Sequence, residues 1–376
     1  MEKRGRGTTL AAVATLSGTA IGAGFLGIPY VVAKSGFLIG LVHLIVLALI
    51  VMLINLYLGE VILRTKETHQ LPGYASKYLG KVARMAMIFA MLFGIYAALI
   101  AYLIGEGQVL SFIFTSTLNY SLWFSLAFFI ILAFLVYRGI EALKKGETIG
   151  MIVVLSIVAI LAIIFLPRIK LNNLAYVSNN PIDWFFPYGV ILFSFLSFSA
   201  LPEVKQEIKG NEKVFKKAII IGALIPLIAY IIFTVAVVGF AGKATPEIAT
   251  IALGKIPSLL AVFTMFTAGF ALSSALRDMY KLDLKMKHFY AWLLAIVVPF
   301  VIFLALYFLK LATFITVLEW SGVVSGGVTG TLTLLMLMKA KKLGNREPEY
   351  KTCINWVIVV LLILLFLVGI LYQFVF

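Results

Sequence analysis

Charged residues and cysteine are scarce in this 376-residue chain. Only 12% of the residues are charged, against roughly a quarter in soluble domains, and 16 residues are Asp or Glu. The single cysteine, Cys353, excludes an intramolecular disulfide and a cysteine-rich metal site. The three histidines form no His-Glu-x-x-His pattern, and there is neither a Gly-x-Ser-x-Gly elbow nor a phosphate-binding loop. We therefore expect no enzyme, no metal centre and no cofactor.

Long apolar runs make up most of the chain instead. Hydrophobic residues account for 62% of it, with a mean hydropathy of +1.09. A helix that crosses a bilayer uses roughly 20 such residues, so the composition predicts an all-α, polytopic membrane protein that forms one domain over residues 1–376. Eleven segments qualify as transmembrane helices, at about 8–33, 36–63, 84–115, 121–137, 148–166, 184–202, 215–240, 257–277, 289–309, 311–338 and 353–375.

Basic residues outnumber acidic ones and give a formal net charge of +15. With the N-terminus inside, 25 of the 31 Lys and Arg residues fall in loops on the cytoplasmic side, as the positive-inside rule requires. The odd number of spans then places the C-terminus outside the cell membrane. Because the basic residues are spread over six short loops and form no stripe, we expect contact with membrane lipids and none with nucleic acid.

Two spans are interrupted by small residues and then by a proline. The interruption in the first span is Ser17–Pro29, with four glycines, and the one in the sixth is Phe193–Pro202, rich in serine. Small residues also allow neighbouring helices to pack closely, but paired interruptions in corresponding halves are typical of a transporter's midplane site. Because the breaks lie five spans apart, their helices run in opposite directions. This predicts an inverted repeat of residues 8–166 and 184–338, followed by an extra helix at 353–375.

An unwound segment inside a membrane exposes backbone groups that a continuous helix would satisfy. The N–H groups that begin one half-helix attract an anion, and the carbonyls that end the other attract an ammonium group or a small cation. A site that offers both kinds of group suits a zwitterion. The breaks in helices 1 and 6 therefore predict a carrier of free amino acids that works by alternating access.

The segment Ser17–Pro29 resembles the first span of the amino acid/auxin permease family, in its bacterial aromatic and hydroxy amino acid permease branch, within the amino acid–polyamine–cation superfamily. Similar segments follow later in the chain, at Ala101–Gly105, Phe193–Pro202, Ala218–Pro226 and Thr267–Asp278. The resemblance covers most of the first eight spans. It implies a leucine-transporter-like fold, which has a 5 + 5 inverted repeat with helices 1 and 6 broken at the midplane.

The resemblance also implies where a substrate would bind. The substrate carboxylate would bind backbone N–H groups around Ala23, Gly24 and Phe25. The amine would bind carbonyls near Ile21 and Ser194. The other expected substrate-binding residues, including those against the substrate side chain, are Thr19, Gly22, Tyr102, Phe193, Phe195, Ser197 and Phe198.

Sodium is one candidate for the coupling ion. The common sodium site of this fold, carried over by resemblance, falls on the carbonyls of Gly18 and Ile21 and the hydroxyls of Thr264 and Thr267. The two threonines share a small, hydroxylated helix face, which is also typical of a packing seam whose hydroxyls bond to their own helix. Two departures weaken the sodium hypothesis: relatives often have asparagine in place of Gly18, and Ala268 lacks a hydroxyl.

Carboxylates inside spans are costly and point to function, and two of them stand out. Glu106 lies one turn after Tyr102 beside a stripe of small residues, so it should face protein; related permeases usually have glycine there. Glu319 lies one turn before Gly322, the first glycine of a close-packing seam, roughly 12 Å from the outer helix end. Each is a candidate proton carrier, with a static hydrogen bond or a gate ion pair as alternatives. Glu60, near a helix end, should be solvated.

Taken together, the residues predict a secondary active amino acid transporter. Proton-coupled symport of neutral amino acids, aromatic or small, into the cytoplasm is the favoured mechanism, with sodium-coupled symport and exchange as alternatives. Nothing in the sequence indicates an obligate protein partner.

Overall fold

The computed structural model describes residues 2–139, 147–282 and 285–375. Within these ranges the regular structure is helical, apart from one isolated bridge between Gly36 and Val177. The α-helices, in chain order, are α1 (Glu2–Ala20), α2 (Gly24–Ser35), α3 (Phe37–Leu63), α4 (Leu71–Leu79), α5 (Lys81–Thr115), α6 (Ser121–Arg138), α7 (Glu147–Phe165), α8 (Leu171–Ala175), α9 (Pro187–Phe195), α10 (Leu201–Glu207), α11 (Phe215–Ala241), α12 (Lys255–Leu282), α13 (His288–Trp292), α14 (Val298–Phe308), α15 (Phe314–Ser321), α16 (Gly327–Leu343) and α17 (Trp356–Val375).

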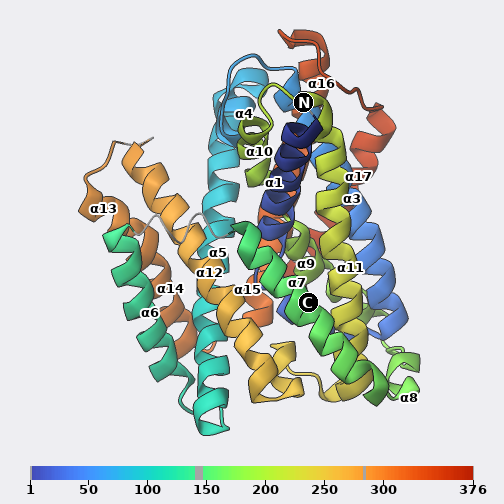
Figure 1. Cartoon of the computed structure of the whole chain (residues 1–376), viewed down its shortest axis with the longest axis vertical. Helices are drawn as coiled ribbons and strands as arrows, with labels where there is room; N and C mark the ends of the chain where they lie inside the picture. Colours follow the sequence, from blue (N-terminus) through green and yellow to red (C-terminus); the bar gives the residue numbers. More distant parts are fainter. Residues whose placement is uncertain (1, 140–146, 283–284, 376) are drawn as a thin grey trace.

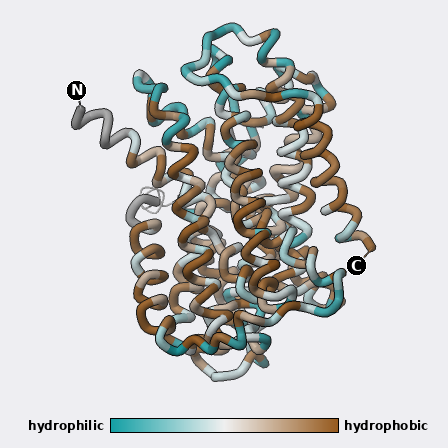
Figure 2. The backbone as a smooth tube through the Cα atoms, turned by 90° about the vertical axis from the view of Figure 1, so that its right-hand side faces the viewer, coloured by the Kyte–Doolittle hydropathy of each residue, from teal (hydrophilic) through white to brown (hydrophobic). Residues whose placement is uncertain are grey.

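Among the described residues, ten helical segments are long and apolar enough to cross a membrane, and the bent pair α1–α2 makes an eleventh. The two halves of that pair meet at 53°. The sixth span consists of α9, a 3-10 turn at Phe198–Ala200 and α10. Figure 2 shows the hydrophobic residues in a band between two ends that carry the hydrophilic ones. The predicted all-helical, multi-pass membrane protein with broken helices 1 and 6 is therefore confirmed.

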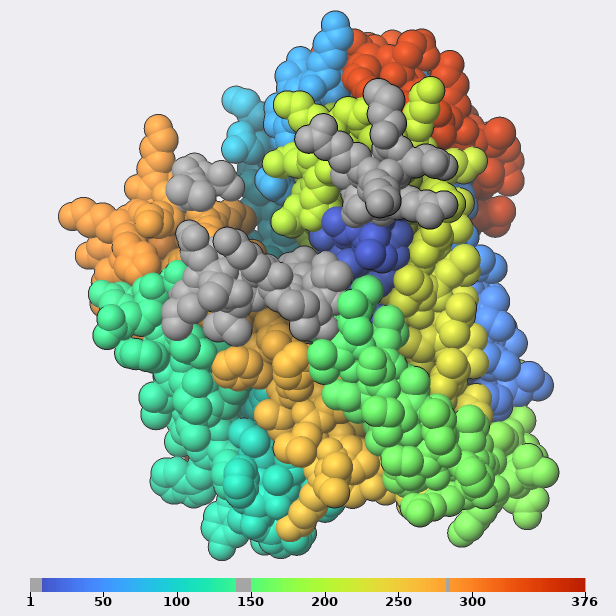
Figure 3. All heavy atoms as spheres, in the orientation of Figure 1, coloured from blue at the N-terminus to red at the C-terminus, as the bar shows by residue number. Residues whose placement is uncertain are grey.

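The helices form two groups, and the broken spans belong to one of them (Figure 1). In one group, α6, α12 and α14 pack against α5. In the other, α1 and α3 pack against α11, while α2 and α3 pack against α9. α7 lies along α1 and α11. α1 reaches the surface between α7 and α11 (Figure 3). α15 contacts both α5 and α9, so it lies between the two groups.

A proline in α11 explains how α1 is held. Pro226 lies inside the helix and has no N–H, so the carbonyl of Gly222, four residues earlier, lacks its usual helical partner. The Ser17 hydroxyl of α1 donates to that carbonyl at 3.2 Å. Gly222 also allows close approach, because a Cβ there would lie 2.8 Å from the Cβ of Leu16. α11 thereby fixes the last turn of α1, just before the first break.

The predicted glycine seam of the tenth span is divided between two neighbours. α15 and α16 are joined by a π-helical turn at Gly322–Gly326, and such a turn rotates the residues that follow it. A Cβ on Gly322 would collide with the carbonyl of Gly189 in α9, whereas a Cβ on Gly330 would lie 2.6 Å from the ring of Phe366 in α17. The glycines do provide close packing, but against two helices.

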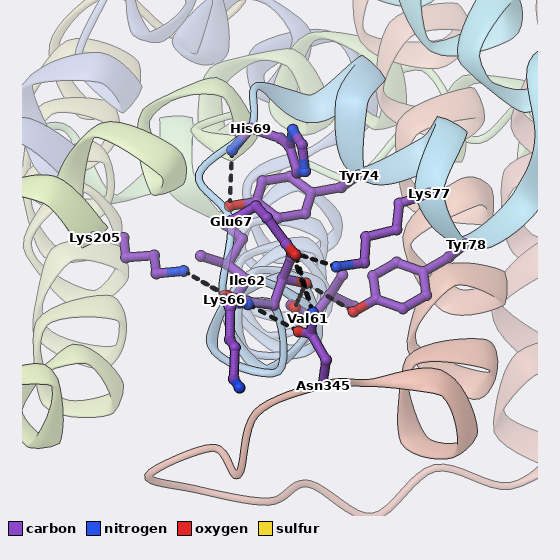
Figure 4. A network of polar contacts seen from close by, with 11 residues as sticks. Val61, Ile62, Lys66, Glu67, His69, Tyr74, Lys77, Tyr78, Lys205 and Asn345 are labelled. Carbon is purple, nitrogen blue, oxygen red and sulfur yellow. Dashed lines mark hydrogen bonds and ion pairs between the residues drawn. The ribbon is translucent and has the colours of Figure 1, made fainter.

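Side chains from other segments cap the C-terminus of α3, where the last carbonyls have no helical partner. Lys205 of α10 donates to the carbonyls of Ile62 and Thr65 at 2.9 Å each (Figure 4). Arg346 donates to the carbonyl of Leu63 at 2.8 Å. Both cations also suit the negative end of the helix dipole. The second half of the broken sixth span is thereby tied to α3.

A second connection at this end joins the loop after α3 to the loop after α16 (Figure 4). The Asn345 side chain accepts a hydrogen bond from the backbone of Lys66 at 2.9 Å and donates one to Glu67 at 3.1 Å. The hydrogen bond from Lys77, together with the one from Asn345, lowers the pKa of Glu67 to about 2. The folded-state pKa is therefore below the ordinary value, so this connection is weakened only as the pH falls toward 2.

Glu60 corrects an expectation, because it is not solvated. Its side chain is 0% exposed. It accepts hydrogen bonds from the backbone N–H of Thr352 at 2.6 Å and from the Thr352 hydroxyl at 2.5 Å, and it pairs with Arg64 at 2.8 Å. The segment 345–352 folds back over the end of α3 and covers the carboxylate. Glu60 therefore anchors this segment to the helix.

Glu60→Ala is expected to destabilise the protein by about 2–4 kcal/mol, because it leaves buried donors without their acceptor. The melting temperature of the purified protein in detergent measures the effect. Glu347→Ala is the matched control, since Glu347 pairs with Lys351 at the surface, where an ion pair contributes about 1 kcal/mol or less. Equal melting temperatures for the two variants would show that Glu60 anchors nothing.

Candidate functional site

The first span unwinds at Ile21–Ala23, between α1 and α2. The first N–H groups of a helix have no acceptor within it, and Ala23, at the N-cap position of α2, provides no side-chain acceptor. The backbone amides of Gly24 and Phe25 therefore face the break at the positive end of a helix dipole. This end of α2 can bind an anion through backbone groups alone.

The sixth span breaks at Leu196 and Ser197. α9 ends at Phe195, Leu196 is extended (φ −64°, ψ 114°), and a 3-10 turn leads into α10. The last carbonyls of α9, which include that of Ser194, lose their helical partners at this break. The negative end of a second helix dipole therefore lies here, and it can bind a cation.

The two breaks touch each other at Gly24. A Cβ on this residue would lie 2.6 Å from the Oγ of Ser194, 2.8 Å from the ring of Phe193 and 3.0 Å from the Cα of Ser194. The absence of a side chain thus allows the start of α2 to lie directly against the last turn of α9. The amide end of α2 and the carbonyl end of α9 are therefore neighbours, and a zwitterion has one charged group for each.

Tyr102 of α5 meets the first break from the opposite side. Its hydroxyl hydrogen-bonds to the backbone of Ala23, and a Cβ on Gly22 would lie 3.1 Å from that hydroxyl. The side chain is 3% exposed. Tyr102 therefore brings a hydroxyl from the other helix group to the first break.

The structure brings most of the predicted binding residues to the breaks, but the Thr19 side chain lies elsewhere. The residues beside the second break are buried or half-buried, namely Phe193, Ser194, Phe195, Ser197 and Phe198. Thr19 is exposed, and its hydroxyl donates back to the carbonyl of Thr15 at 2.7 Å. The Phe25 ring packs on Tyr230 and Phe233 of α11, which leaves its backbone amide for the site.

Two polar residues at the breaks escape the sequence analysis. The Tyr230 hydroxyl lies 2.8 Å from the carbonyl of Ala20 and 2.9 Å from that of Ser194. Asn55 of α3 donates to the Ser197 hydroxyl at 3.0 Å, and its side-chain oxygen is buried without a partner among the described residues. The only signal for either residue in the sequence is a hydrogen-bonding side chain in the middle of an apolar span.

The two threonines expected at a sodium site lie on α12 and form hydrogen bonds within that helix. Thr264 donates to the carbonyl of Ala261 at 3.1 Å, and Thr267 donates to the carbonyl of Phe263 at 2.8 Å, so both hydroxyls bond to their own helix. Among the described residues, α1, which carries Gly18, packs mainly on α11, α7 and α10. The packing-seam interpretation therefore accounts for both threonine hydroxyls as they lie here.

Glu106 is fully buried, as predicted for a residue that faces protein. The glycines on either side of it face three helices: a Cβ on Gly105 would lie 2.5 Å from Met265 of α12 and 3.1 Å from Phe314 of α15, and one on Gly107 would collide with Ser125 of α6. Neither carboxylate oxygen has a hydrogen-bond partner among the described residues. A charged carboxylate without a partner is costly inside a membrane, and binding a proton removes that cost.

Glu319 lies closer to its helix end than expected. α15 begins at Phe314 rather than at residue 311, which places Glu319 about 8 Å from the start of the helix at 1.5 Å per residue. The side chain is 4% exposed. One oxygen accepts a hydrogen bond from Gln373 of α17 at 3.4 Å. Unlike Glu106, it therefore has a partner, which comes from the extra helix.

An eleven-span helical bundle with adjacent breaks in its first and sixth helices has the leucine-transporter fold. The crystal structure of MhsT in complex with L-phenylalanine has the same fold, with a TM-score of 0.70 and 15% sequence identity over 97% of each chain. The family whose model matches this chain defines it as a membrane permease and not an enzyme. The chain belongs to the tryptophan/tyrosine permease family, whose model matches residues 6–373.

Two individual relatives are each less than 30% identical to this chain. Glutamine transporter 2 of Aliivibrio fischeri is 29% identical over 233 residues, which cover 60% of this chain and 59% of the relative. Tyrosine-specific transport system 1 of Haemophilus influenzae is 26% identical over 228 residues, which cover 60% of this chain and 56% of the relative. The chain thus spans less than two thirds of the length of these two relatives.

Proposed function

We propose that this chain is a secondary active transporter of neutral amino acids, aromatic or small, which it carries into the cytoplasm. The observation that carries the proposal is the contact at Gly24, where the start of α2 lies against the last turn of α9. One amino acid can bind the first with its carboxylate and the second with its ammonium group. The substrates named for the relatives, glutamine and tyrosine, and the phenylalanine of the structural neighbour support the same class.

In this proposal backbone groups at the two breaks bind both charged groups of the substrate. The carboxylate binds the amides of Ala23, Gly24 and Phe25, with the Tyr102 hydroxyl beside them. The ammonium group binds carbonyls of the first break and of Ser194. The side chain of the substrate lies against the aromatic and hydroxyl groups of the second break, which are those of Phe193, Phe195, Ser197 and Phe198.

The two helix groups supply the moving parts. The group with the broken spans rocks against the group around α5, so that the site opens to one side of the cell membrane and then to the other. The excess of Lys and Arg in the loops on the side of the membrane where the N-terminus lies supports a cytoplasmic N-terminus and an external C-terminus. We place residues 8–166 and 184–338 as the two inverted repeats, residues 353–375 as the extra helix, and the chain in the bacterial branch of the amino acid/auxin permeases.

Protons are the proposed coupling ion, and Glu106 is the proposed carrier. Its burial without a hydrogen-bond partner among the described residues supports this choice. Glu319 is the second candidate. Sodium at Gly18, Ile21, Thr264 and Thr267 is the alternative, because a different conformation can bring α1 to α12. Exchange without a coupling ion is the third mechanism that the uptake experiment distinguishes.

Purified protein in liposomes is expected to concentrate labelled amino acid when the pH outside is one unit lower than inside and the membrane potential is held at zero. That gradient corresponds to about 1.4 kcal/mol per proton and supports about tenfold accumulation when one proton moves with each substrate. L-tyrosine, L-phenylalanine and L-glutamine are tested separately. Accumulation driven only by sodium would move the coupling site to α1 and α12, and exchange with no net accumulation would exclude coupling.

A further inference from the structure

Tyr230 lies where both broken helices end. It belongs to α11, is 1% exposed, and points its hydroxyl at the carbonyl of Ala20 and at that of Ser194. Ala20 is the last residue of α1, and Ser194 lies in the last turn of α9. The negative ends of two helix dipoles therefore converge on one phenolic hydroxyl.

This arrangement has one proton for two acceptors. A tyrosine hydroxyl donates one hydrogen bond, yet both carbonyl oxygens lie within donating distance, at 2.8 and 2.9 Å. Only one carbonyl can receive the proton at a time, and the lone pairs of the other face the phenol oxygen. The carbonyl of Ala20 also accepts a hydrogen bond from the backbone N–H of Gly22 at 2.8 Å. The phenol proton can therefore serve Ser194, and each carbonyl keeps a lone pair that a further N–H donor can use.

The ring that carries this hydroxyl is held on two sides. Phe25 of α2 stacks on it with the ring planes 4° apart and the centroids 5.9 Å apart, and Phe195 packs beside it at 5.1 Å. Both partners belong to the half-helices that flank the breaks. The hydroxyl therefore cannot move far from the two carbonyls without separating α2 and α9, since aromatic contacts of this kind are close-packed.

We propose that Tyr230 is a positioning residue for the ammonium group of the substrate. Its hydroxyl holds the carbonyls of Ala20 and Ser194 beside each other, so that a substrate ammonium group can donate to the remaining lone pairs of both. This inference rests on the proposed amino acid site and names a residue of that site.

The test compares amino acids with analogues that lack the ammonium group. Binding and exchange are measured for L-tyrosine, L-phenylalanine and L-glutamine, and for the des-amino acid of each, in wild-type protein and in Tyr230→Phe. Tyr57→Phe is the matched control, because Tyr57 is equally buried and its hydroxyl donates to one carbonyl, that of Cys353, away from the breaks.

Tyr230→Phe is expected to raise the KM for the amino acid about tenfold, the loss of one hydrogen bond, with a maximal exchange rate within about twofold of wild type. The affinity for the des-amino acid should stay unchanged, as should every value for Tyr57→Phe. Equal weakening of both ligands would mean that Tyr230 only supports the fold and would overturn the inference. Wild-type protein that binds none of the three amino acids would instead overturn the proposed function, and with it the inference.

A second variant covers the case in which Tyr230→Phe does not fold. Site-specific 3-fluorotyrosine at position 230 keeps the shape and donates a stronger hydrogen bond. We expect it to shift the KM for the amino acid at least about twofold and to leave the des-amino acid unaffected. Unchanged affinity for both ligands in this folded variant would contradict the positioning role.

Discussion

Gly24→Ala is expected to reduce amino acid uptake about tenfold or more while the protein still folds. The added methyl group would lie 2.6 Å from the Oγ of Ser194, 2.8 Å from the ring of Phe193 and 3.0 Å from the Cα of Ser194, so α2 must move away from α9. Overpacking of this kind costs about 1–3 kcal/mol, and the displacement separates the amides of one break from the carbonyls of the other. Uptake kinetics in liposomes and the melting temperature in detergent measure the two effects.

Gly150→Ala is the matched control for that experiment. Gly150 lies in α7, and a Cβ there would meet nothing within 4 Å, so uptake should stay at the wild-type level. Combining Gly24→Ala with Ser194→Ala removes the closest obstacle, and we expect the double variant to recover part of the lost uptake. Normal KM and rate for Gly24→Ala alone would mean that the contact between the breaks is not the binding site.

The position of each break could be predicted because local chemistry determines it. Glycine weakens a helix, and Gly22 and Gly24 lie on either side of the unwound Ala23 in a segment that otherwise has to cross a membrane. The apolar runs likewise determine the spans, since no other arrangement satisfies their backbone groups in lipid. Fold class, break positions and the polarity of the exposed backbone groups all follow from such short-range features.

The partners of the breaks could not be predicted in the same way. Tyr230 is 36 residues from Ser194 and 210 residues from Ala20 in the chain, and nothing local indicates which face of α11 meets both. Glu60 is covered by Thr352, which is 292 residues further along. Its burial results from a loop that folds back, so its distance from a helix end was misleading. Packing between distant segments determines both cases.

Glu106→Gln is expected to abolish proton-driven accumulation while exchange stays within about twofold of wild type. Glutamine has nearly the same shape but cannot take up and release a proton. Glu106 is 0% exposed, and neither of its oxygens has a hydrogen-bond partner in the part of the chain that the structure describes. The substitution therefore breaks no hydrogen bond among the described residues. If the variant loses accumulation but keeps exchange, the loss results from coupling and not from lower stability.

Comparison with Glu319→Gln makes the result specific. Glu319 is the second candidate proton carrier, 4% exposed and hydrogen-bonded to Gln373 at 3.4 Å, and its variant should keep proton-driven uptake. Exchange of labelled for unlabelled amino acid requires substrate binding and alternating access but no net proton movement. A Glu106→Gln protein that still concentrates substrate under a pH gradient would remove Glu106 from the mechanism. If only Glu319→Gln loses proton-driven uptake, the proton carrier is Glu319 at the contact between α15 and α17. The extra helix would then take part in coupling.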